Sequence, residues 1–201
     1  MVEAAAPPKK SEKLEEDATA AAVEEALGKI KVIKQDFITE VKAWDDEDFK
    51  IDADLQKGIQ EDLGFSKPSR IQKHAIPMIA SAPFKNLVAQ SKNGSGKTGA
   101  FMIGSAIRID RTEKAIQVIV VANSQIMSTQ IADLFKKLVK HTDIRVIDVP
   151  VEQSTDGEVL VSTVGQLCKM LGGRKAVKLD KMKVIVFDEA DFYFGEEGTV
   201  A

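Results

Sequence analysis

The sequence has little of several features that point to particular classes of protein. Its one cysteine, Cys168, excludes an internal disulfide, and such scarcity is typical of intracellular proteins. We expect the Cys168 thiol to be buried and inert, because the residue follows the apolar pattern of a helix. The only two histidines, His74 and His141, stand apart from any pattern of metal ligands. We expect both to be surface or helix-packing residues.

Long apolar runs are also missing. No early run resembles a signal peptide, and the longest strand-like run, residues 115–122, is too short to span a bilayer. We therefore expect an intracellular protein with no membrane partner.

Charge is divided unevenly along the 201 residues. Residues 1–64 hold nine Lys and Arg against seventeen Asp and Glu, whereas residues 65–201 hold nineteen against fourteen. The second part is mildly basic, which suits contact with phosphates. A hydrophobic content of 44% is enough for one folded domain of ordinary size.

The most informative motif is Ser-Lys-Asn-Gly-Ser-Gly-Lys-Thr at residues 91–98. It stands between an apolar run at 86–90, predicted to be a strand, and a helix-forming run at 99–108. Glycines let a chain curl around a phosphate, and the start of the following helix adds N–H donors and a positive dipole end. Lys97 would then reach the β- and γ-phosphates, and the Thr98 hydroxyl would hold Mg²⁺. An ordinary loop between a strand and a helix is the alternative.

A second apolar run, residues 183–187, ends in Asp-Glu-Ala-Asp at 188–191. The run predicts a buried parallel strand, and ligands of open α/β sheets bind at the carboxyl ends of strands. Alone, this acidic cluster is typical of a solvated turn. With a phosphate loop upstream, we interpret it as the second half of an ATP site. Asp188 would hold Mg²⁺ through its water shell, and Glu189 would orient or deprotonate the attacking water.

A third segment, Gly-Phe-Ser-Lys-Pro-Ser-Arg-Ile-Gln at residues 64–72, indicates which nucleotide binds. Ser69 is predicted to cap a helix whose first turns contain Gln72. A side-chain amide offers a donor and an acceptor, so Gln72 can pair with the N6 and N7 edge of adenine, which guanine lacks. Phe65 is expected to stack on the base. In isolation, Gln72 would be interpreted as a surface glutamine.

Together the three segments resemble the DEAD-box RNA helicase family, in its first RecA-like domain, over about residues 45–201. They match the Q motif, motif I and motif II of that family in order and spacing. Ala-Gln-Ser at residues 89–91 is most similar to the nuclear-pore-associated mRNA-export helicases. The resemblance implies an α/β, RecA-like P-loop domain with a mainly parallel sheet flanked by helices. It also implies ATP and Mg²⁺ as cofactors.

The resemblance further implies site residues and partners. Lys97, Asp188 and Glu189 would be catalytic, and Thr98 and Asp188 would hold Mg²⁺ largely through water. The residues implied for nucleotide binding are Phe65, Lys67, Gln72, Ser91, Lys92, Asn93, Gly94, Ser95, Gly96, Lys97 and Thr98. The implied partners are RNA, a second RecA-like domain beyond residue 201, and nuclear-pore or mRNA-export factors. The implied location is cytoplasmic or nuclear, with the nuclear envelope included.

One family feature has two candidates in this chain. The family places a lone aromatic upstream of the Q motif, where it helps to enclose the adenine. Phe49 is the candidate, although it lies slightly closer to Gln72 than the family spacing, and Trp44 is the other option. The alternative is that both anchor the flanking segment on the core.

Two segments depart from the family pattern where it contacts RNA. Residues 122–127 are Ala-Asn-Ser-Gln-Ile-Met in place of the usual Pro-Thr-Arg-Glu-Leu-Ala, and residues 163–166 are Thr-Val-Gly-Gln in place of Thr-Pro-Gly-Arg. Thr163 and Gly165 still form a candidate phosphate site at a helix start, with a plain helix cap as the alternative. The alternative function is a divergent nucleotide-dependent binding module that has lost RNA remodelling. A P-loop ATPase that does not act on nucleic acid comes third.

Residues 1–44 are expected to form a flexible, partly helical and acidic extension before a RecA-like domain at residues 45–201. A capping-type serine, Ser11, begins an Ala- and Glu-rich helical run that ends near Gly28. This run is either a solvated tail or a regulatory helix that lodges near the ATP cleft. Residues 30–42 fit a strand or a helix equally well.

Strands and helices alternate from residue 52 onwards, which indicates a parallel sheet covered by helices on both faces. The predicted helices are 53–63, 70–80, 97–108, 124–140 and 164–171, and the predicted strands are 86–90, 116–122, 144–149, 158–162 and 183–188.

Overall fold

The structure is a computed structural model that describes residues 43–84, 86–149, 156–172 and 177–194. The chain divides into two units, residues 1–38 and 39–201, and all the described residues belong to the second unit. The predictions for the extension at residues 1–44 lie outside the described residues, except at its last two positions.

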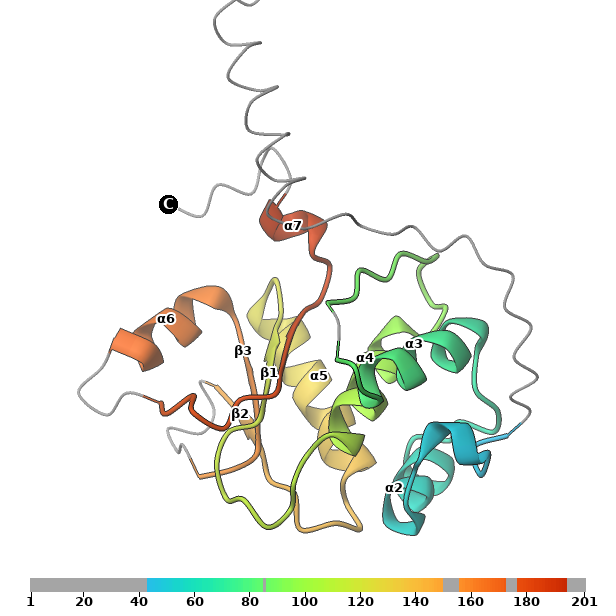
Figure 1. Ribbon diagram of the computed structural model, residues 1–201. Coiled ribbons are helices and arrows are strands. Elements are labelled where there is room, and N and C mark those ends of the chain that lie inside the picture. The colour runs from blue at the N-terminus through green and yellow to red at the C-terminus, as the bar shows by residue number, and fades with distance from the viewer. Residues whose placement is uncertain (1–42, 85, 150–155, 173–176, 195–201) are drawn as a thin grey trace, which may run out of the picture. The chain divides into compact units, whose positions relative to one another are not determined.

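Four parallel strands form the sheet, in the spatial order β2-β3-β1-β4 (Figure 1). Val121, the last residue of β1, pairs with Ser162 of β3 and with Phe187 of β4, so these three strands end level with one another. Ligands of open α/β sheets bind beyond this carboxyl edge. The strand bounds are Val118–Val121 for β1, Val146–Asp148 for β2, Val159–Ser162 for β3 and Val184–Phe187 for β4.

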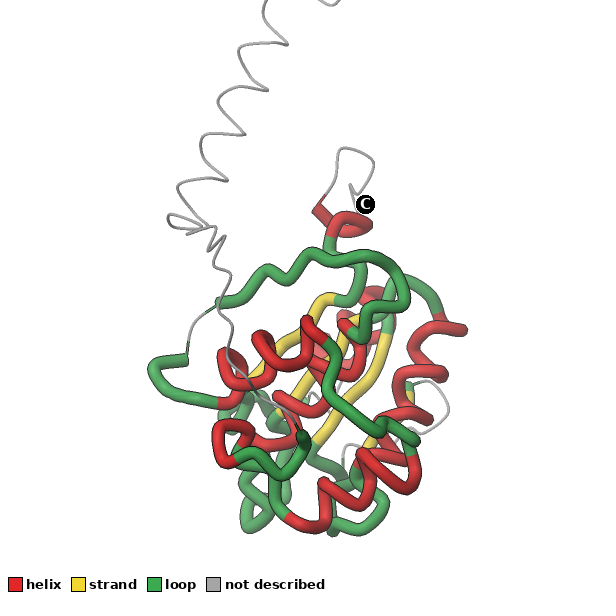
Figure 2. Tube along the Cα trace, turned by 90° about the vertical axis from the view of Figure 1, so that its right-hand side faces the viewer, coloured by secondary structure: helices red, strands yellow, loops and turns green. Residues whose placement is uncertain are grey.

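Helices cover both faces of the sheet, as predicted (Figures 1 and 2). Alternate residues of β1 point to opposite faces: Val118 and Val120 belong to one hydrophobic core, and Ile119 and Val121 to the other. The first core is completed by α3 (Arg70–Ala80), α4 (Lys97–Ile107) and α5 (Gln125–Leu138). The second core is completed by α6 (Val164–Gly172). The sequence-based α/β fold is thus confirmed.

The segment before the Q motif is a broken helix. The predicted helix 53–63 is α2 (Ala53–Lys57), which continues as a π-helical turn over Gly58–Asp62. A Cβ atom on Gly58 would lie 1.9 Å from the carbonyl oxygen of Leu138, so only glycine lets this turn pack against the end of α5. Two short helices were not predicted, a 3-10 turn at Glu47–Phe49 and α7 at Asp191–Phe194.

The predicted strand at residues 86–90 is wrong. These residues adopt no strand, and Val88 is 71% exposed, although Leu87 packs against the first core. Composition alone cannot make a strand, because its backbone needs a neighbour to pair with. Both edges of β1 are taken by β3 and β4, and residues 86–90 do not pair with the outer edge of β2 or of β4 either. The expectation of a buried strand at 183–188 is also only half right, since Ile185 and Phe187 of the edge strand β4 are 44% and 37% exposed.

The prediction for Cys168 is wrong as well, because its side chain is exposed. In α6 it follows Leu167, which faces the second core, and a step of one residue along a helix turns the side chain away from the buried face. His141 lies on the surface, where its Nε2 atom is 2.7 Å from a carboxylate oxygen of Asp62. Within the described part of the chain, no three metal-binding side chains cluster and no helix is long and apolar enough to cross a membrane.

Candidate functional site: a phosphate loop facing two carboxylates

The glycine-containing loop before α4 has the backbone of a phosphate-binding loop. Gly94 and Gly96 have φ angles of 74° and 98°, in the left-handed region that favours glycine. Gly96 is the N-cap of α4 and has no side chain with which to cap it. The first N–H groups of α4 therefore point out of the helix without intrahelical acceptors, at its positive end.

Side chains of the same loop brace it from within. The Nζ atom of Lys97 donates a hydrogen bond to the carbonyl oxygen of Ser91 at 2.9 Å, and the hydroxyl groups of Ser91 and Ser95 are 2.6 Å apart. Lys97 is half-buried. The loop is therefore held in a curled shape by its own lysine, which is the side chain expected to contact phosphate.

Asp188 and Glu189 follow the carboxyl end of β4 and line the same cavity as the phosphate loop. Asp188 is 9% exposed, and burial, followed by the charge of Glu189, raises the pKa of its carboxyl above the ordinary value. Lys97 opposes this shift through its positive charge. Glu189 has a φ of 50°, a conformation that costs energy for a residue other than glycine, and such strain concentrates at functional sites. Burial and the nearby Asp188 also raise the pKa of Tyr193 to about 12.

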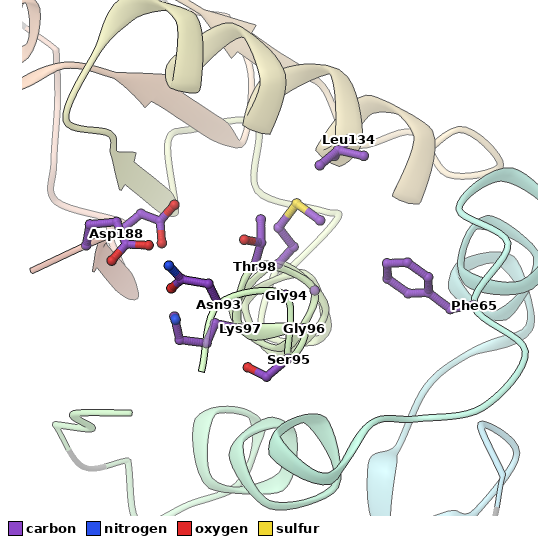
Figure 3. Close-up of a pocket in the computed structure, with 12 residues that line it drawn as sticks. Phe65, Asn93, Gly94, Ser95, Gly96, Lys97, Thr98, Leu134 and Asp188 are labelled. Atoms are coloured by element: carbon purple, nitrogen blue, oxygen red, sulfur yellow. The ribbon is translucent and has the colours of Figure 1, made fainter. Parts of the chain in front are cut away.

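One cavity of about 270 Å³ brings these groups together (Figure 3). Figure 3 shows Lys97 and Asn93 toward Asp188 at one end and Phe65 at the other, with Leu134 of α5 above. The cavity thus has a polar end with two hard oxygen donors, Thr98 and Asp188, and an apolar end. Its lining residues are Phe65, Asn93, Gly94, Ser95, Gly96, Lys97, Thr98, Gly99, Met102, Leu134, Asp188 and Glu189.

Gln72 lies behind the loop and does not line the cavity. Its Oε1 atom accepts the N–H of Ser69 at 2.8 Å, and Ser69 in turn caps α3, as predicted. Its Nε2 atom donates to the carbonyl oxygen of Gly96 at 3.3 Å. The side chain is 4% exposed, yet the amide retains a second donor hydrogen and a second acceptor lone pair. Gln72 therefore connects the start of α3 to the phosphate loop.

The two candidate upstream aromatics anchor the Q-motif segment. Phe49 and Trp44 are 0% and 1% exposed, and their ring centroids are 5.6 Å apart. Neither face is therefore free for a base, and the anchoring alternative is correct. The Nε1 atom of Trp44 donates to the backbone carbonyl of Phe65 at 2.7 Å, which fixes the residue at the apolar end of the cavity.

Other sequence-predicted residues lie away from the cavity. Lys67 and Lys92 are exposed, and Ser91 contributes its carbonyl to Lys97 from outside the lining. Three lining residues were not predicted: Gly99, Met102 and Leu134. Of these, only Gly99 had a local signal, a small residue directly after motif I. A Cβ on it would lie 2.6 Å from Nε2 of Gln72 and 3.0 Å from Cε2 of Phe65.

Thr163 and Gly165 follow β3 on the same sheet edge, at the start of α6, and β1 lies between β3 and β4. Gly165 is exposed, with open space around its Cα atom. The N–H of Thr163 donates to Oε1 of Gln166 at 3.4 Å. A side chain of α6 therefore already accepts one of the backbone N–H groups that could bind a phosphate. These residues lie apart from the cavity lined by Lys97 and Asp188.

The polar end of the cavity fits a nucleotide phosphate with its metal ion. The curled backbone with left-handed glycines forms a cradle of N–H groups, and Lys97 supplies a positive charge. The hydroxyl of Thr98 and the carboxyl of Asp188 are the hard oxygen donors that Mg²⁺ prefers.

Sequence comparisons agree with this geometry. The DEAD/DEAH box helicase family model matches residues 69–200. The DEAD-box ATP-dependent RNA helicase 38 of Oryza sativa is 35% identical over 164 residues, which cover 76% of this chain and 32% of that protein. The ATP-dependent RNA helicase DBP5 of Yarrowia lipolytica is 37% identical over 150 residues, 72% of this chain and 30% of that protein. The chain spans about a third of the length of these relatives.

Solved structures of a yeast relative have the same fold. Saccharomyces cerevisiae Dbp5 bound to RNA and ADP BeF3 superposes with a TM-score of 0.67 at 32% identity, over 76% of this chain and 40% of that one. A variant of the same protein bound to Nup159, a Gle1 variant, IP6 and ADP gives a TM-score of 0.65 at 32% identity, over 74% and 40%. From the matched motifs, the shared fold and the family match, the chain belongs to the DEAD/DEAH box helicase family.

Proposed function

We propose that the chain is the ATP-binding part of an ATP-dependent RNA helicase, which uses Mg·ATP to clamp and locally distort an RNA duplex. One observation carries the proposal: Lys97 and Thr98 line the same cavity as Asp188 and Glu189, although the two pairs come from distant parts of the sequence. The active unit in this proposal is residues 45–201, with residues 1–44 as an acidic extension.

Each polar side chain of the cavity has a proposed task. Lys97 neutralises charge on the β- and γ-phosphates, and Thr98 and Asp188 hold Mg²⁺, largely through water. The ion, when bound, neutralises charge that develops on the phosphate oxygens. Glu189, exposed next to Asp188, orients or deprotonates the attacking water.

Adenine is proposed to be recognised beside the loop. Gln72 would pair with the N6 and N7 edge through the donor and acceptor that its contacts with Ser69 and Gly96 leave over. Phe65 would offer its ring face to the base. Lys67, Ser91, Lys92, Asn93, Gly94, Ser95 and Gly96 complete the proposed nucleotide site.

RNA is proposed to bind at the carboxyl edge of the sheet, where α5 and α6 begin, with Thr163 and Gly165 among its contacts. A second RecA-like domain would close on this edge, since the relatives are about three times as long as the chain. The exposed Ile185 and Phe187 of β4 support further packing beside this strand, because exposed apolar side chains gain from being covered.

The proposed setting is mRNA export at the nuclear pore, in the cytoplasm or nucleus. The support is the similarity to Dbp5, of which one solved structure contains Nup159 and Gle1. Factors of that kind are therefore the proposed protein partners.

Steady-state ATP hydrolysis with and without RNA tests the proposal. We expect the 201-residue chain to bind ADP but to turn over ATP very slowly, because an arginine from a second domain contributes about 10³–10⁵ in rate. Strong RNA-stimulated hydrolysis by residues 1–201 alone would contradict the two-domain mechanism. If nucleotide binds but RNA fails to bind even with a second domain supplied, the nucleotide-dependent binding module is the better interpretation. The altered segments at 122–127 and 163–166 favour that alternative.

A further inference from the structure

Two glutamines link the starts of α5 and α6. The Nε2 atom of Gln166 donates a hydrogen bond to Oε1 of Gln125 at 2.5 Å, across a separation of 41 residues in the sequence. Gln125 is the first residue of α5, and Gln166 lies in the first turn of α6. Both residues are half-buried. The contact therefore joins two separate helices at their N-terminal ends.

The same two amides are bonded at their other ends. Nε2 of Gln125 donates to the carbonyl oxygen of Val149, which follows β2, at 3.4 Å. Oε1 of Gln166 accepts the N–H of Thr163, which follows β3, at 3.4 Å. Since a side-chain amide carries both a donor and an acceptor, each glutamine can continue the chain of hydrogen bonds. The chain connects the segments that follow β1, β2 and β3.

This chain of hydrogen bonds crosses the carboxyl edge of the sheet. β1 and β3 are neighbours, with Val121 paired to Ser162, and the pairing extends to Ala122, whose N–H donates to the carbonyl of Ser162 at 2.9 Å. α5 and α6 therefore begin side by side. Each helix start carries free N–H groups and a positive dipole end. The spacing between the two starts decides whether two phosphates of one strand can be bound at once.

Both glutamines occupy positions at which the chain departs from the helicase pattern. Gln125 stands where Pro-Thr-Arg-Glu-Leu-Ala has glutamate, and Gln166 stands where Thr-Pro-Gly-Arg has arginine. Glutamate and arginine are complementary in charge, and two amides are complementary in hydrogen bonding. The two departures therefore lie in contact with each other in the structure.

We propose that Gln125 and Gln166 act as one positioning pair, which fixes the starts of α5 and α6 at the spacing that binds successive phosphates of an RNA strand. The inference rests on the proposed function for its ligand. A neutral pair performs this task without an ionic contact, so salt does not weaken the link between the helices, as it would weaken an exposed ion pair.

Charged replacements show why the two positions must change together. A glutamate at position 125 lacks the donor for Val149 and adds negative charge at a helix start, where it repels phosphate. An arginine at position 166 lacks the acceptor for Thr163. A glutamate at position 125 and an arginine at position 166, introduced together, would form an ion pair between the starts of α5 and α6 and add no net charge.

An alanine cycle on the 201-residue chain tests the pair. Fluorescence anisotropy with a labelled oligouridine at low salt measures affinity, and thermal unfolding measures stability. We expect Gln125→Ala and Gln166→Ala each to weaken RNA binding by about threefold to tenfold, the scale of one hydrogen bond. The double variant should be no weaker than either single variant. Gln130→Ala, an exposed glutamine of the same helix, should leave affinity unchanged.

A charge-swap cycle provides the rescue. Gln125→Glu alone should weaken RNA binding, and Gln125→Glu with Gln166→Arg should restore affinity to within about threefold of the unaltered chain. Additive losses in the alanine cycle, or lower unfolding temperatures with unchanged affinity, would overturn the inference while the helicase proposal stands. Failure of the unaltered chain to bind any RNA would overturn the inference, and failure to bind RNA with a second domain also supplied would overturn the helicase proposal as well.

Discussion

Lys97 donates a hydrogen bond from its Nζ atom to the carbonyl oxygen of Ser91, 2.9 Å away at the other end of the phosphate loop. This contact closes the loop around the space that a phosphate would enter. The ammonium group has three donor hydrogens, so Lys97 can keep this contact and still donate a charge-assisted hydrogen bond to a phosphate oxygen.

Replacing this lysine separates its two tasks. Lys97→Met should weaken ADP binding by about 1.5–3 kcal/mol, the worth of a hydrogen bond to a charged group. The free energy of unfolding should also fall, because the hydrogen bond from the charged Nζ atom to the carbonyl oxygen of Ser91 is lost. Isothermal titration and urea unfolding measure the two quantities. Lys137→Met, an exposed lysine of α5, controls for the loss of charge, and equal ADP affinity in both variants would contradict the assignment of Lys97.

Gly99 tests the packing between the Q motif and α4. Gly99→Ala would place a Cβ atom 2.6 Å from Nε2 of Gln72, and something must move. We expect a loss of about 1–3 kcal/mol in the free energy of unfolding, the usual cost of overpacking, together with weaker ADP binding. Gly172→Ala is the matched control, because a Cβ atom added there in α6 would meet no atom within 4 Å and alanine favours a helix. If Gly99→Ala has an unchanged free energy of unfolding and unchanged ADP affinity, the position of Gln72 does not depend on the space that Gly99 leaves.

Asp188 should reduce stability at neutral pH, because its buried site disfavours the ionised carboxylate. The folded-state pKa is raised, so this carboxyl stabilises the fold only below its unfolded pKa, and the benefit is lost as the pH rises through the folded pKa. Asp188→Asn should therefore increase the free energy of unfolding at pH 7 by about 0.5–2 kcal/mol without Mg²⁺.

The same substitution should remove the dependence of nucleotide affinity on Mg²⁺. Urea unfolding measures the effect on stability. The free energy of unfolding of Asp188→Asn should exceed that of the unaltered chain at pH 7, and the two should be equal near pH 3. Asp133→Asn, on the exposed side of α5, controls for the change of a carboxylate. Destabilisation by Asp188→Asn at pH 7 would show that the carboxylate is favoured by its surroundings, against this account.

Local signals in the sequence were sufficient for much of the fold. Helix α3 begins and ends as predicted, because Ser69 and Gln72 satisfy each other's backbone N–H groups at its start. The phosphate loop and the carboxylates of Asp188 and Glu189 also carry short, self-contained patterns, and the structure places them around one cavity.

Features that depend on distant partners could not be predicted in this way. The apolar run at 86–90 has the composition of a strand, but its backbone pairs with none of the four strands, and composition does not reveal whether a partner is present. Leu134 lines the cavity from the middle of α5, where no motif marks it. The hydrogen bond between Gln125 and Gln166 depends on β1 and β3 ending side by side. The sequence shows only that both residues differ from the family pattern, not that they are neighbours.

Nucleotide selectivity is the most direct test of the central claim, that this cavity and Gln72 form an adenine nucleotide site. Isothermal titration of the 201-residue chain with ADP and with GDP, both with Mg²⁺, measures it. ADP should bind and GDP should not, and Gln72→Ala should weaken ADP binding by about 1–3 kcal/mol, the worth of one bidentate base contact. Comparable affinities for ADP and GDP in the unaltered chain would contradict the account.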